Sequence, residues 1–401
     1  MAEATYYDDL ETRSPDARAD AQLTAVNFQI AKAAEAADSC LPDVGALQDI
    51  ADLRHLPVLR KSELAKWQAD RPPFGGMPVS NVALVVHAPG PIYEPGGISH
   101  DWWRMGRFLH AAGIGAGDIV QNCFGYHLTP AGMIFESGAR AVGAAVLPAG
   151  TGQTELQVTA ARDIGTTAYA GTPDYLKVIL DKADEMGVAL KFSKAAVGGG
   201  ALFPSLRQEY VDRGITCMQS YATADLGSIA YETPSLEGMV VDEGVIVEIV
   251  TPGTGDPVAP GEVGEVVVTS LTPDYPLIRF ATGDMSAVLP GTSPCGRTNM
   301  SIKGWMGRAD QTTKIKGMFV SPEQVAALVA KHPEVSRARV IAGRGGQQDT
   351  MLVKLETAGG DAEAYAGSIA DTLKLKGTVE LHAPDSLPKD GLVIEDQRTY
   401  D

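Results

Sequence analysis

The stretch that organises this chain runs from Pro276 to Pro322 and reads PLIRFATGDMSAVLPGTSPCGRTNMSIKGWMGRADQTTKIKGMFVSP. Its two ends are RFATGD (279–284) and GRADQTTKIKG (307–317). Each end places a fixed charge beside a glycine, a pattern that is typical of a turn between strands. Such turns can hold a polar ligand where two bodies of the chain meet. We therefore expect a large and a small domain to meet within this stretch.

The length and composition agree with two domains. The chain has 401 residues, more than one ordinary core accommodates. Hydrophobic residues make up 44% and charged residues 21%, as in globular proteins. The formal net charge is −17, and the sequence has no basic stripe. A nucleic-acid partner is therefore not expected, because binding to phosphates requires clustered positive charge.

The sequence also argues against membrane spans and disulfides. It has no apolar run of about 18 residues, the length that a spanning helix needs. The start, MAEATYYDDLETRSPDARAD, lacks the basic and apolar segments of a signal peptide. The four cysteines lie far apart, at Cys40, Cys123, Cys217 and Cys295, with no C-x-x-C pair. We therefore expect a cytoplasmic protein without a disulfide framework.

Between residues 81 and 230, short apolar runs alternate with helical patterns. The expected strands are 82–87, 118–124, 144–148, 167–170, 194–197 and 217–221. The expected helices are 100–112, 130–143, 156–164, 175–186 and 205–213, after an amphipathic helix at 15–38. This alternation predicts a parallel sheet with helices on both faces. Ligands of such sheets bind at the carboxyl ends of the strands.

The sequence pattern changes twice after this region. Residues 238–290 read as short strands separated by Pro-Gly turns, which predicts a β-rich subdomain. After Arg308 the pattern is that of a compact α+β unit. The expected fold class is therefore α/β, with a large N-terminal domain at 1–307 that combines βαβ units with the β-rich subdomain. A small α+β C-terminal lobe is expected at 308–401.

Several motifs occur in one order along the chain. They are LPVLRKSEL (56–64), GDIVQNCFGYHLTPAG (117–132), GQTELQVTAARDIGTTAYAGTPDYL (152–176), VGGGALFP (197–204), SYATADLG (220–227), PGEVGEVVVTSL (260–271), PLIRFATGD (276–284), SPCGRT (293–298) and GWMGRADQTTKIKGMFVSP (304–322). Over nearly the whole chain, this series resembles the adenylate-forming (AMP-binding) ligases, and within them the phenylacetate–CoA ligases.

The resemblance implies a two-step reaction. A carboxylate attacks the α-phosphate of ATP to give an acyl-adenylate and pyrophosphate, and the CoA thiol then displaces AMP. The implied cofactors are ATP/AMP, Mg²⁺ and CoA, and the implied partner is a small carboxylic acid. The resemblance also implies a homodimer, because similar ligases form dimers.

The resemblance also assigns nucleotide-binding residues. These are Gly199, Gly200, Ala201, Tyr221, Ala222, Thr223, Asp284 and Arg308. Asp284 suits a ribose diol, because a carboxylate accepts two hydroxyl hydrogen bonds. Alternatively, it caps its own turn. The Tyr221 ring suits stacking on adenine, but a tyrosine at a strand end also serves packing.

The remaining implied roles concern chemistry and motion. Asp225, Arg308 and Lys389 are the candidate catalytic residues, and Asp225 is also the candidate Mg²⁺ ligand. Phe124, Tyr126 and His127 follow a strand where similar ligases build the acyl pocket, and their rings suit an aryl acid. His127 is either a base or a polar pocket residue. Asp310 occupies the hinge position of the family.

The sequence departs from the family pattern where phosphates bind. The phosphate loop of the family reads roughly S-S-G-T-T-G-x-P, whereas residues 87–95 read HAPGPIYEP. The hydroxyls are missing, prolines remove amide donors, and Glu94 adds an expected repulsion. Ala222 replaces a threonine and Asp225 a glutamate. Near the C-terminus, Leu392 stands where the family has a lysine, three residues after Lys389.

Two functions therefore remain open. The first is a phenylacetate–CoA ligase-like acyl-CoA synthetase that activates an aryl acid with ATP. The second is a degenerate homologue that binds AMP or acyl-CoA, acting as an acyl transferase or hydrolase or as a non-catalytic binding protein. The first is the leading interpretation, and the departures motivate the second, because they affect the adenylation half of the reaction.

Overall fold

The computed structural model describes residues 6–35, 39–41, 44–88, 92–200, 202–307, 309, 313–316, 318–320, 322–345, 348–388, 390 and 392–398. The chain forms two compact units. The first comprises Met1–Glu248, Val267–Thr282 and Ala287–Trp305. The second comprises Ile249–Val266, Gly283–Ser286 and Met306–Asp401. The boundary predicted at 307/308 stays a prediction.

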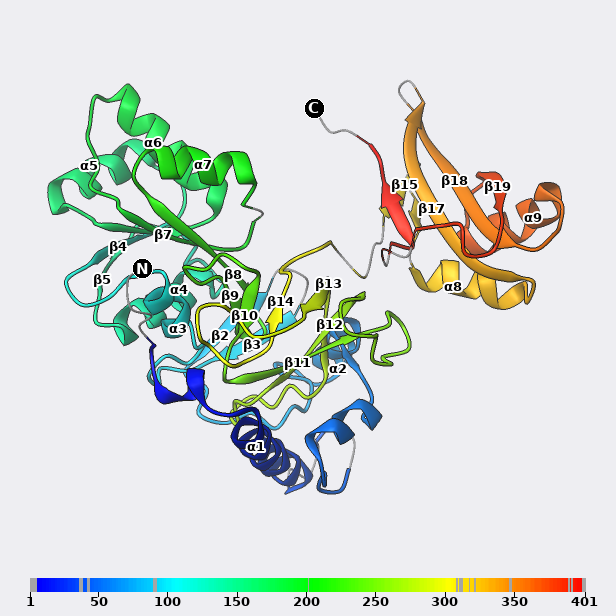
Figure 1. The fold of residues 1–401 in the computed structure, drawn as a ribbon, viewed down its shortest axis with the longest axis horizontal. Helices are drawn as coiled ribbons and strands as arrows, with labels where there is room; N and C mark the ends of the chain where they lie inside the picture. Colours follow the sequence, from blue (N-terminus) through cyan, green and yellow to red (C-terminus); the bar gives the residue numbers. More distant parts are fainter. Residues whose placement is uncertain are drawn as a thin grey trace. The chain divides into compact units, whose positions relative to one another are not determined.

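A parallel sheet forms the centre of the first unit (Figure 1). The strands pair in the order β8-β7-β6-β4-β5, and each neighbouring pair is parallel. Their bounds are Ile119–Asn122 for β4, Ala145–Pro148 for β5, Ala168–Gly171 for β6, Lys194–Val197 for β7 and Thr216–Thr223 for β8. The predicted parallel α/β sheet is therefore confirmed.

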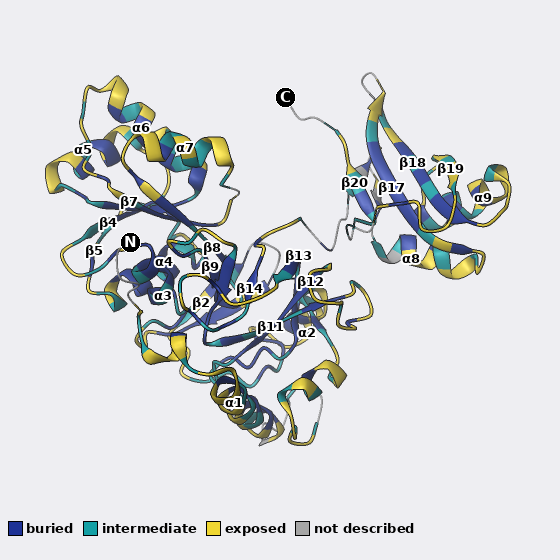
Figure 2. Ribbon diagram, viewed as in Figure 1, coloured by how far each residue is buried: buried dark blue, intermediate teal, exposed yellow. Residues whose placement is uncertain are grey.

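Helices cover both faces of this sheet. They are α3 (Gly106–Ala111), α4 (Ala131–Ala141), α5 (Thr154–Ile164), α6 (Pro173–Glu185) and α7 (Pro204–Asp212). Successive side chains of a strand point to opposite faces. Accordingly, Ala168 and Ala170 of β6 join the core that contains α3 and α4. Tyr169 between them joins the core of α5 and α6. The strands β4, β6 and β7 are mostly buried between these layers, whereas β5 at the edge is more exposed (Figure 2).

One helix start differs from the sequence-based expectation. The helix predicted from residue 100 begins at Gly106, because the Asp101 carboxylate accepts hydrogen bonds from the backbone N–H groups of Met105 and Gly106. The motif LPVLRKSEL ends in α2 (Lys61–Asp70). There the Glu63 carboxylate accepts a 3.0 Å hydrogen bond from the Arg60 N–H, which closes the first turn.

The β-rich region continues the same sheet. Its strands are β9 (Gly227–Tyr231), β10 (Met239–Val241), β11 (Val245–Val250), β12 (Val263–Ser270), β13 (Phe280–Leu289) and β14 (Ser301–Ile302), in the order β11-β12-β13-β14-β10-β9-β8. The short β1 (Leu59–Arg60) pairs in parallel with β13. The turn expected at RFATGD is wrong: most of this motif lies inside β13, and Gly283 takes a φ of 74° within the strand.

The stretch expected to be a phosphate loop also contains strand. β2 (Leu84–Ala88) and β3 (Ile92–Gly96) form an antiparallel pair, in which Val86 is opposite Glu94. Residues 89–91 between them lie outside the described part of the chain. Glu94 is therefore a strand residue, and its side chain is 1% exposed.

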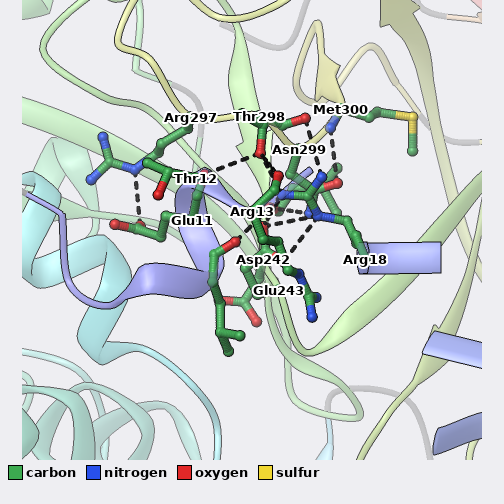
Figure 3. A network of polar contacts seen from close by, with 12 residues as sticks. Glu11, Thr12, Arg13, Arg18, Asp242, Glu243, Arg297, Thr298, Asn299 and Met300 are labelled. Atoms are coloured by element: carbon green, nitrogen blue, oxygen red, sulfur yellow. Dashed lines mark hydrogen bonds and ion pairs between the residues drawn. The ribbon is translucent and has the colours of Figure 1, made fainter. Parts of the chain in front are cut away.

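Buried ion pairs fix the N-terminal segment (Figure 3). It comprises the 3₁₀ helix η1 (Asp9–Thr12) and the helix α1 (Pro15–Glu35), and a second 3₁₀ helix, η2 (Ile50–His55), follows. Nε of Arg297 lies 2.9 Å from Oε1 of Glu11, with side chains 2% and 1% exposed. Glu243 binds Arg13 at 2.7 Å and Arg18 at 3.0 Å. The chain start is thus tied to the β-rich region.

The second unit has its own sheet and core. The hairpin of β15 (Thr313–Ile315) and β16 (Met318–Val320) precedes α8 (Pro322–Lys331). A sheet of order β19-β18-β17-β20 follows, with β17 at Val335–Gly345, β18 at Gln348–Thr357, β19 at Thr378–His382 and β20 at Ile394–Asp396. The helix α9 (Ala362–Leu373) packs in the same core. The predicted α+β composition is confirmed.

None of the helices in the described ranges is both long and apolar enough to traverse a membrane. All four cysteines carry free thiols.

Candidate functional site

The predicted ligand-binding residues of the first unit cluster where the parallel strands end. Phe124 follows β4, Gly199 follows β7, and Asp225 lies in the turn after β8. Parallel strands present their carboxyl ends at one edge of the sheet, which is where ligands of such folds bind. The topology thus places these three residues at the same edge.

An aromatic pair lies against the glycine loop after β7. Phe124 stacks on Phe135 of α4, with ring centroids 4.3 Å apart and an interplanar angle of 27°. A Cβ built on Gly199 would lie 3.6 Å from Phe124, and one on Gly198 would lie 3.6 Å from Phe135. The loop backbone is therefore accessible to flat groups at van der Waals distance from an aromatic surface. Phe135 was missed because in sequence it reads only as the apolar face of a helix.

Backbone conformation and close packing explain why this loop contains glycines. Gly199 takes a φ of 68°, in the region that L-residues disfavour. A Cβ on Gly198 would lie 2.9 Å from Oγ of Ser220. The carbonyl of Gly200 accepts a 2.9 Å hydrogen bond from Nε2 of Gln219. The loop thus keeps a fixed shape with little room for side chains.

The other two predicted acyl-pocket residues are placed differently. The Tyr126 hydroxyl accepts a 2.8 Å hydrogen bond from Nδ2 of Asn122, and burial raises the pKa of this phenol. A Cβ on Gly132 would lie 2.7 Å from the Tyr126 ring, so the ring packs on the start of α4. His127 is exposed. The structure brings Phe124, but not His127, into the buried aromatic cluster.

Tyr221 connects two strands through its hydroxyl. It donates a 3.0 Å hydrogen bond to Oγ1 of Thr282 in β13, and its side chain is 8% exposed. This supports the packing alternative, while stacking on adenine stays a prediction. Ala222 and Thr223 complete β8. Oγ1 of Thr223 accepts a 3.2 Å hydrogen bond from the Leu226 N–H, which closes the turn that carries Asp225.

The two ends of the 276–322 stretch are hydrogen-bonded to each other. The Ala309 N–H donates to the Gly283 carbonyl at 2.7 Å, and the Met285 N–H donates to the Gly307 carbonyl at 2.9 Å. Asp284, 7% exposed, lies between these contacts on β13. The segment around Gly283 and the segment around Ala309, which are apart in the sequence, therefore lie side by side.

The charge of Arg279 has a structural role. Its side chain is 2% exposed, and Nε binds Oε2 of Glu248 at 2.9 Å. Nη1 donates to the carbonyls of Arg54 and Leu56. The guanidinium thus joins η2 to the start of β13 and is not presented to a ligand.

Four predicted site residues lie outside the described part of the chain: Ala201, Arg308, Asp310 and Lys389.

Asp225 belongs to a charged cluster that the sequence did not reveal. Nζ of Lys61, the first residue of α2, lies 3.1 Å from Oδ1 and 3.3 Å from Oδ2 of Asp225. Glu94 and Tyr275 lie beside this pair. Neither carboxyl oxygen of Glu94 has a hydrogen-bond partner among the described residues. The cluster therefore combines one buried ion pair with one buried carboxyl.

Burial changes the expected effect of Glu94. It raises the pKa of this carboxyl well above its usual range, and the nearby Asp225 carboxylate raises it further. The neutral form is thereby favoured. The repulsion that the sequence predicted for Glu94 assumed an exposed carboxylate in a loop, and the structure places it inside, on β3.

The described residues do not fit a magnesium ion held by the protein. They contain no group of three or more histidine, cysteine, aspartate or glutamate side chains arranged to hold a metal. The Asp225 side chain is 4% exposed and already paired with the Lys61 ammonium. Mg²⁺ prefers several oxygen ligands in octahedral geometry. The metal role of Asp225 nevertheless stays a prediction, because Mg²⁺ in nucleotide sites is usually held by one or two carboxylates together with substrate phosphates and water.

An apolar cavity of about 230 Å³ lies elsewhere in the first unit. It is lined by residues of α1, β1 and α2, including Ile30 and Trp67, by Leu56 just after η2, and by Ile278. None of the residues predicted for the ligand site lines it. It is separate from the edge of the sheet described above.

Known sequences resemble this chain over most of its length. The phenylacetate–coenzyme A ligase of Aromatoleum evansii is 29% identical over 329 residues, 77% of this chain and 73% of that protein. The enzyme of the same name from Escherichia coli K12 is 29% identical over 331 residues, 77% of this chain and 74% of that protein. That from Pseudomonas putida is 28% identical over 381 residues, 88% and 85% of the two chains. No family model matches the chain.

Solved structures share the fold. An open conformation of 2-hydroxyisobutyryl-CoA ligase with 2-HIB-AMP and CoA has a TM-score of 0.70 at 22% identity, covering 94% of this chain and 91% of that one. Its thioesterification state also has a TM-score of 0.70, covering 99% and 94%. The chain therefore has the fold of this acyl-CoA ligase over nearly its whole length. In sequence, the chain is a homologue of proteins named phenylacetate–coenzyme A ligase, as the motifs indicated.

Proposed function

We propose that the protein is an AMP-forming acid–CoA ligase that activates an aryl carboxylic acid. The stacked Phe124–Phe135 pair against the glycine loop carries this proposal, because it offers an aromatic surface beside an open backbone at the ligand-binding edge. The similarity to phenylacetate–CoA ligases over about three quarters of the chain supports it.

The proposed mechanism has two steps. An oxygen of the acid forms a bond to the α-phosphorus of ATP, and the bond to pyrophosphate breaks. The sulfur of CoA then bonds to the acyl carbon, the bond to AMP breaks, and the thiol proton is lost to solvent. The mixed anhydride between the steps is reactive, so the site must exclude water. Buried aromatic rings such as Phe124 contribute to this exclusion.

The residues of the chain act in this mechanism by binding and orientation. The backbone of Gly198–Gly200 accommodates the flat base, and Asp284 accepts hydrogen bonds from ribose hydroxyls. Arg308 and Lys389 are proposed to contact phosphate, and Asp310 is proposed as the hinge of a C-terminal lobe at 308–401. No step depends on a metal bound to Asp225.

AMP release tests the proposal. The pure protein is mixed with ATP, CoA and a panel of aryl and aliphatic acids in magnesium-containing buffer, and AMP and acyl-CoA are quantified. We expect equal amounts of AMP and acyl-CoA with at least one aryl acid. The Escherichia coli phenylacetate–CoA ligase serves as the positive control. Absence of AMP with every acid, while that control is active, would overturn the proposal.

A second function is favoured by the residues that replace the phosphate-binding elements. Leu392 stands at the position of the family lysine, and residues 87–95 contain no serine or threonine. Such a protein would use an acyl-adenylate or acyl-CoA made elsewhere, as a transferase or hydrolase. Calorimetry separates the two functions. Binding of AMP or CoA without measurable ATP binding supports the second, and ATP binding as strong as that of AMP excludes it.

Two further expectations remain proposals. The four free thiols support a cytoplasmic location. A homodimer is expected only from the resemblance, and sedimentation of the pure protein tests it.

A further inference from the structure

Lys61 and Asp225 are 164 residues apart in sequence and form an ion pair beside the candidate ligand site. The Lys61 side chain is 32% exposed, whereas that of Asp225 is 4% exposed. An ammonium group has three N–H donors. The ion pair is therefore asymmetric: the carboxylate is buried, while the ammonium is partly open to solvent and to a ligand.

The surroundings hold this ammonium in place. Lys61 is the first residue of the ten-residue α2, where the positive end of the helix dipole disfavours a cation, so the Asp225 carboxylate is the group that holds the ammonium there. Asp225 lies in the turn between β8 and β9, at the carboxyl edge of the sheet. Glu94, close to both residues, is 1% exposed, and its two oxygens have no hydrogen-bond partner among the described residues. The pair thus lies beside a buried polar group, at the edge where ligands bind.

The sequence has few other groups in this region that suit a phosphate. Residues 87–95 contain no serine or threonine, and Leu392 stands at the position expected for a lysine. A nucleotide phosphate needs N–H donors and positive charge. Lysine supplies both as a compact point charge on a flexible stem.

We propose that Lys61 is a phosphate-contacting cation of the nucleotide site and that Asp225 is its positioning residue. The ammonium binds a nonbridging oxygen of the AMP phosphate, or of the same phosphate in the acyl-adenylate. Asp225 thereby acts through the lysine and not through a metal. This inference rests on the proposed nucleotide-dependent function, because it assumes that AMP binds at this edge.

Calorimetry with three probes tests the role of Lys61. AMP, ATP and adenosine are titrated into the wild-type protein, Lys61→Ala and Lys66→Ala. Lys66 is an exposed residue of the same helix and serves as the matched control. We expect Lys61→Ala to weaken AMP binding about tenfold or more, with adenosine binding unchanged and Lys66→Ala behaving as the wild type. Equal weakening of AMP and adenosine, or no weakening, overturns the proposal.

A double variant separates direct contact from neutralisation of Asp225. If Lys61 only compensates the buried carboxylate, Lys61→Ala/Asp225→Asn recovers wild-type AMP affinity, and the proposal fails. If Lys61 contacts phosphate, the double variant binds AMP as weakly as Lys61→Ala does. Lys61→Arg should retain part of the affinity, because it keeps the charge. Thermal unfolding of each variant verifies that it is folded.

The AMP-release assay on the same samples distinguishes the two proposals. A wild-type protein that binds AMP through Lys61 but releases none from ATP overturns the ligase function alone. A wild-type ligase whose AMP release and AMP affinity are unchanged in Lys61→Ala overturns the Lys61 proposal alone. No AMP binding by the wild-type protein overturns both.

Discussion

The Tyr221 hydroxyl donates a 3.0 Å hydrogen bond to Oγ1 of Thr282, joining the end of β8 to β13. Both residues are buried, with exposed fractions of 8% and 7%. β8 leads into the turn that carries Asp225, and β13 continues from Thr282 to Asp284. This one bond therefore joins two strands: β8 leads to Asp225, and β13 contains Asp284. Both residues are predicted to contact the nucleotide or its metal ion.

Removal of this hydroxyl should affect both stability and nucleotide binding. Tyr221→Phe keeps the ring but loses the buried hydrogen bond, so we expect the free energy of unfolding to fall by about 1 kcal/mol. AMP affinity should fall severalfold, because the two strands lose a connection. Urea unfolding and AMP titration measure these effects. Tyr169→Phe is the control, since its hydroxyl donates a 3.0 Å hydrogen bond to the Thr172 carbonyl. An equal loss of AMP affinity in both variants would contradict the prediction.

The glycine loop gives a second prediction. Gly199→Ala introduces a side chain at a φ of 68°, which costs about 1 kcal/mol, and places its Cβ 3.6 Å from Phe124. Gly187→Ala has a similar φ of 64°, with no atom within 4 Å of the new Cβ. Both variants should lose similar stability in thermal unfolding. Only Gly199→Ala should lower AMP affinity and AMP release. Normal nucleotide binding by Gly199→Ala would show that this loop does not contact the adenine base.

The elements that sequence predicted well are those with local signals. An apolar run placed β7 at residues 194–197, and the helical pattern at 156–164 placed α5, which the structure has at Thr154–Ile164. The failures involve pairing between distant segments. Gly283 suggested a turn, but β13, which pairs with β12 and β14, continues through it to Leu289. The Lys61–Asp225 pair has no local signal, because only the folded sheet brings α2 to the turn after β8.

Glu94 shows the same limit and gives a pH prediction. Its folded-state pKa is raised well above the usual 4.5, so the folded protein keeps a proton that the unfolded chain releases. Stability contributed by this group is complete below pH 4.5 and is lost as the pH rises toward the folded-state pKa. Glu94→Gln cannot lose a proton, so it should match the wild type at acidic pH and be more stable at neutral pH.

Urea unfolding of the wild type and Glu94→Gln between pH 4 and 8 measures this difference. Glu155→Gln, on the exposed surface of α5, serves as the control for loss of a carboxylate. The control should follow the pH dependence of the wild type. If Glu94→Gln also follows it, the buried carboxyl does not titrate as its burial predicts.

The ion pair between Arg297 and Glu11 gives the last prediction (Figure 3). Its side chains are 2% and 1% exposed, so Glu11→Gln leaves a buried guanidinium without its carboxylate. We expect a loss of about 3–5 kcal/mol in the free energy of unfolding. Replacing both partners, as in Glu11→Leu/Arg297→Met, should cost less than Glu11→Gln, because no buried charge remains. The exposed pair Arg162–Asp163, with side chains 50% and 59% exposed, should contribute almost nothing when Asp163 is replaced by asparagine. A double variant less stable than Glu11→Gln would mean that the pair stabilises the N-terminal segment beyond its cost of desolvation.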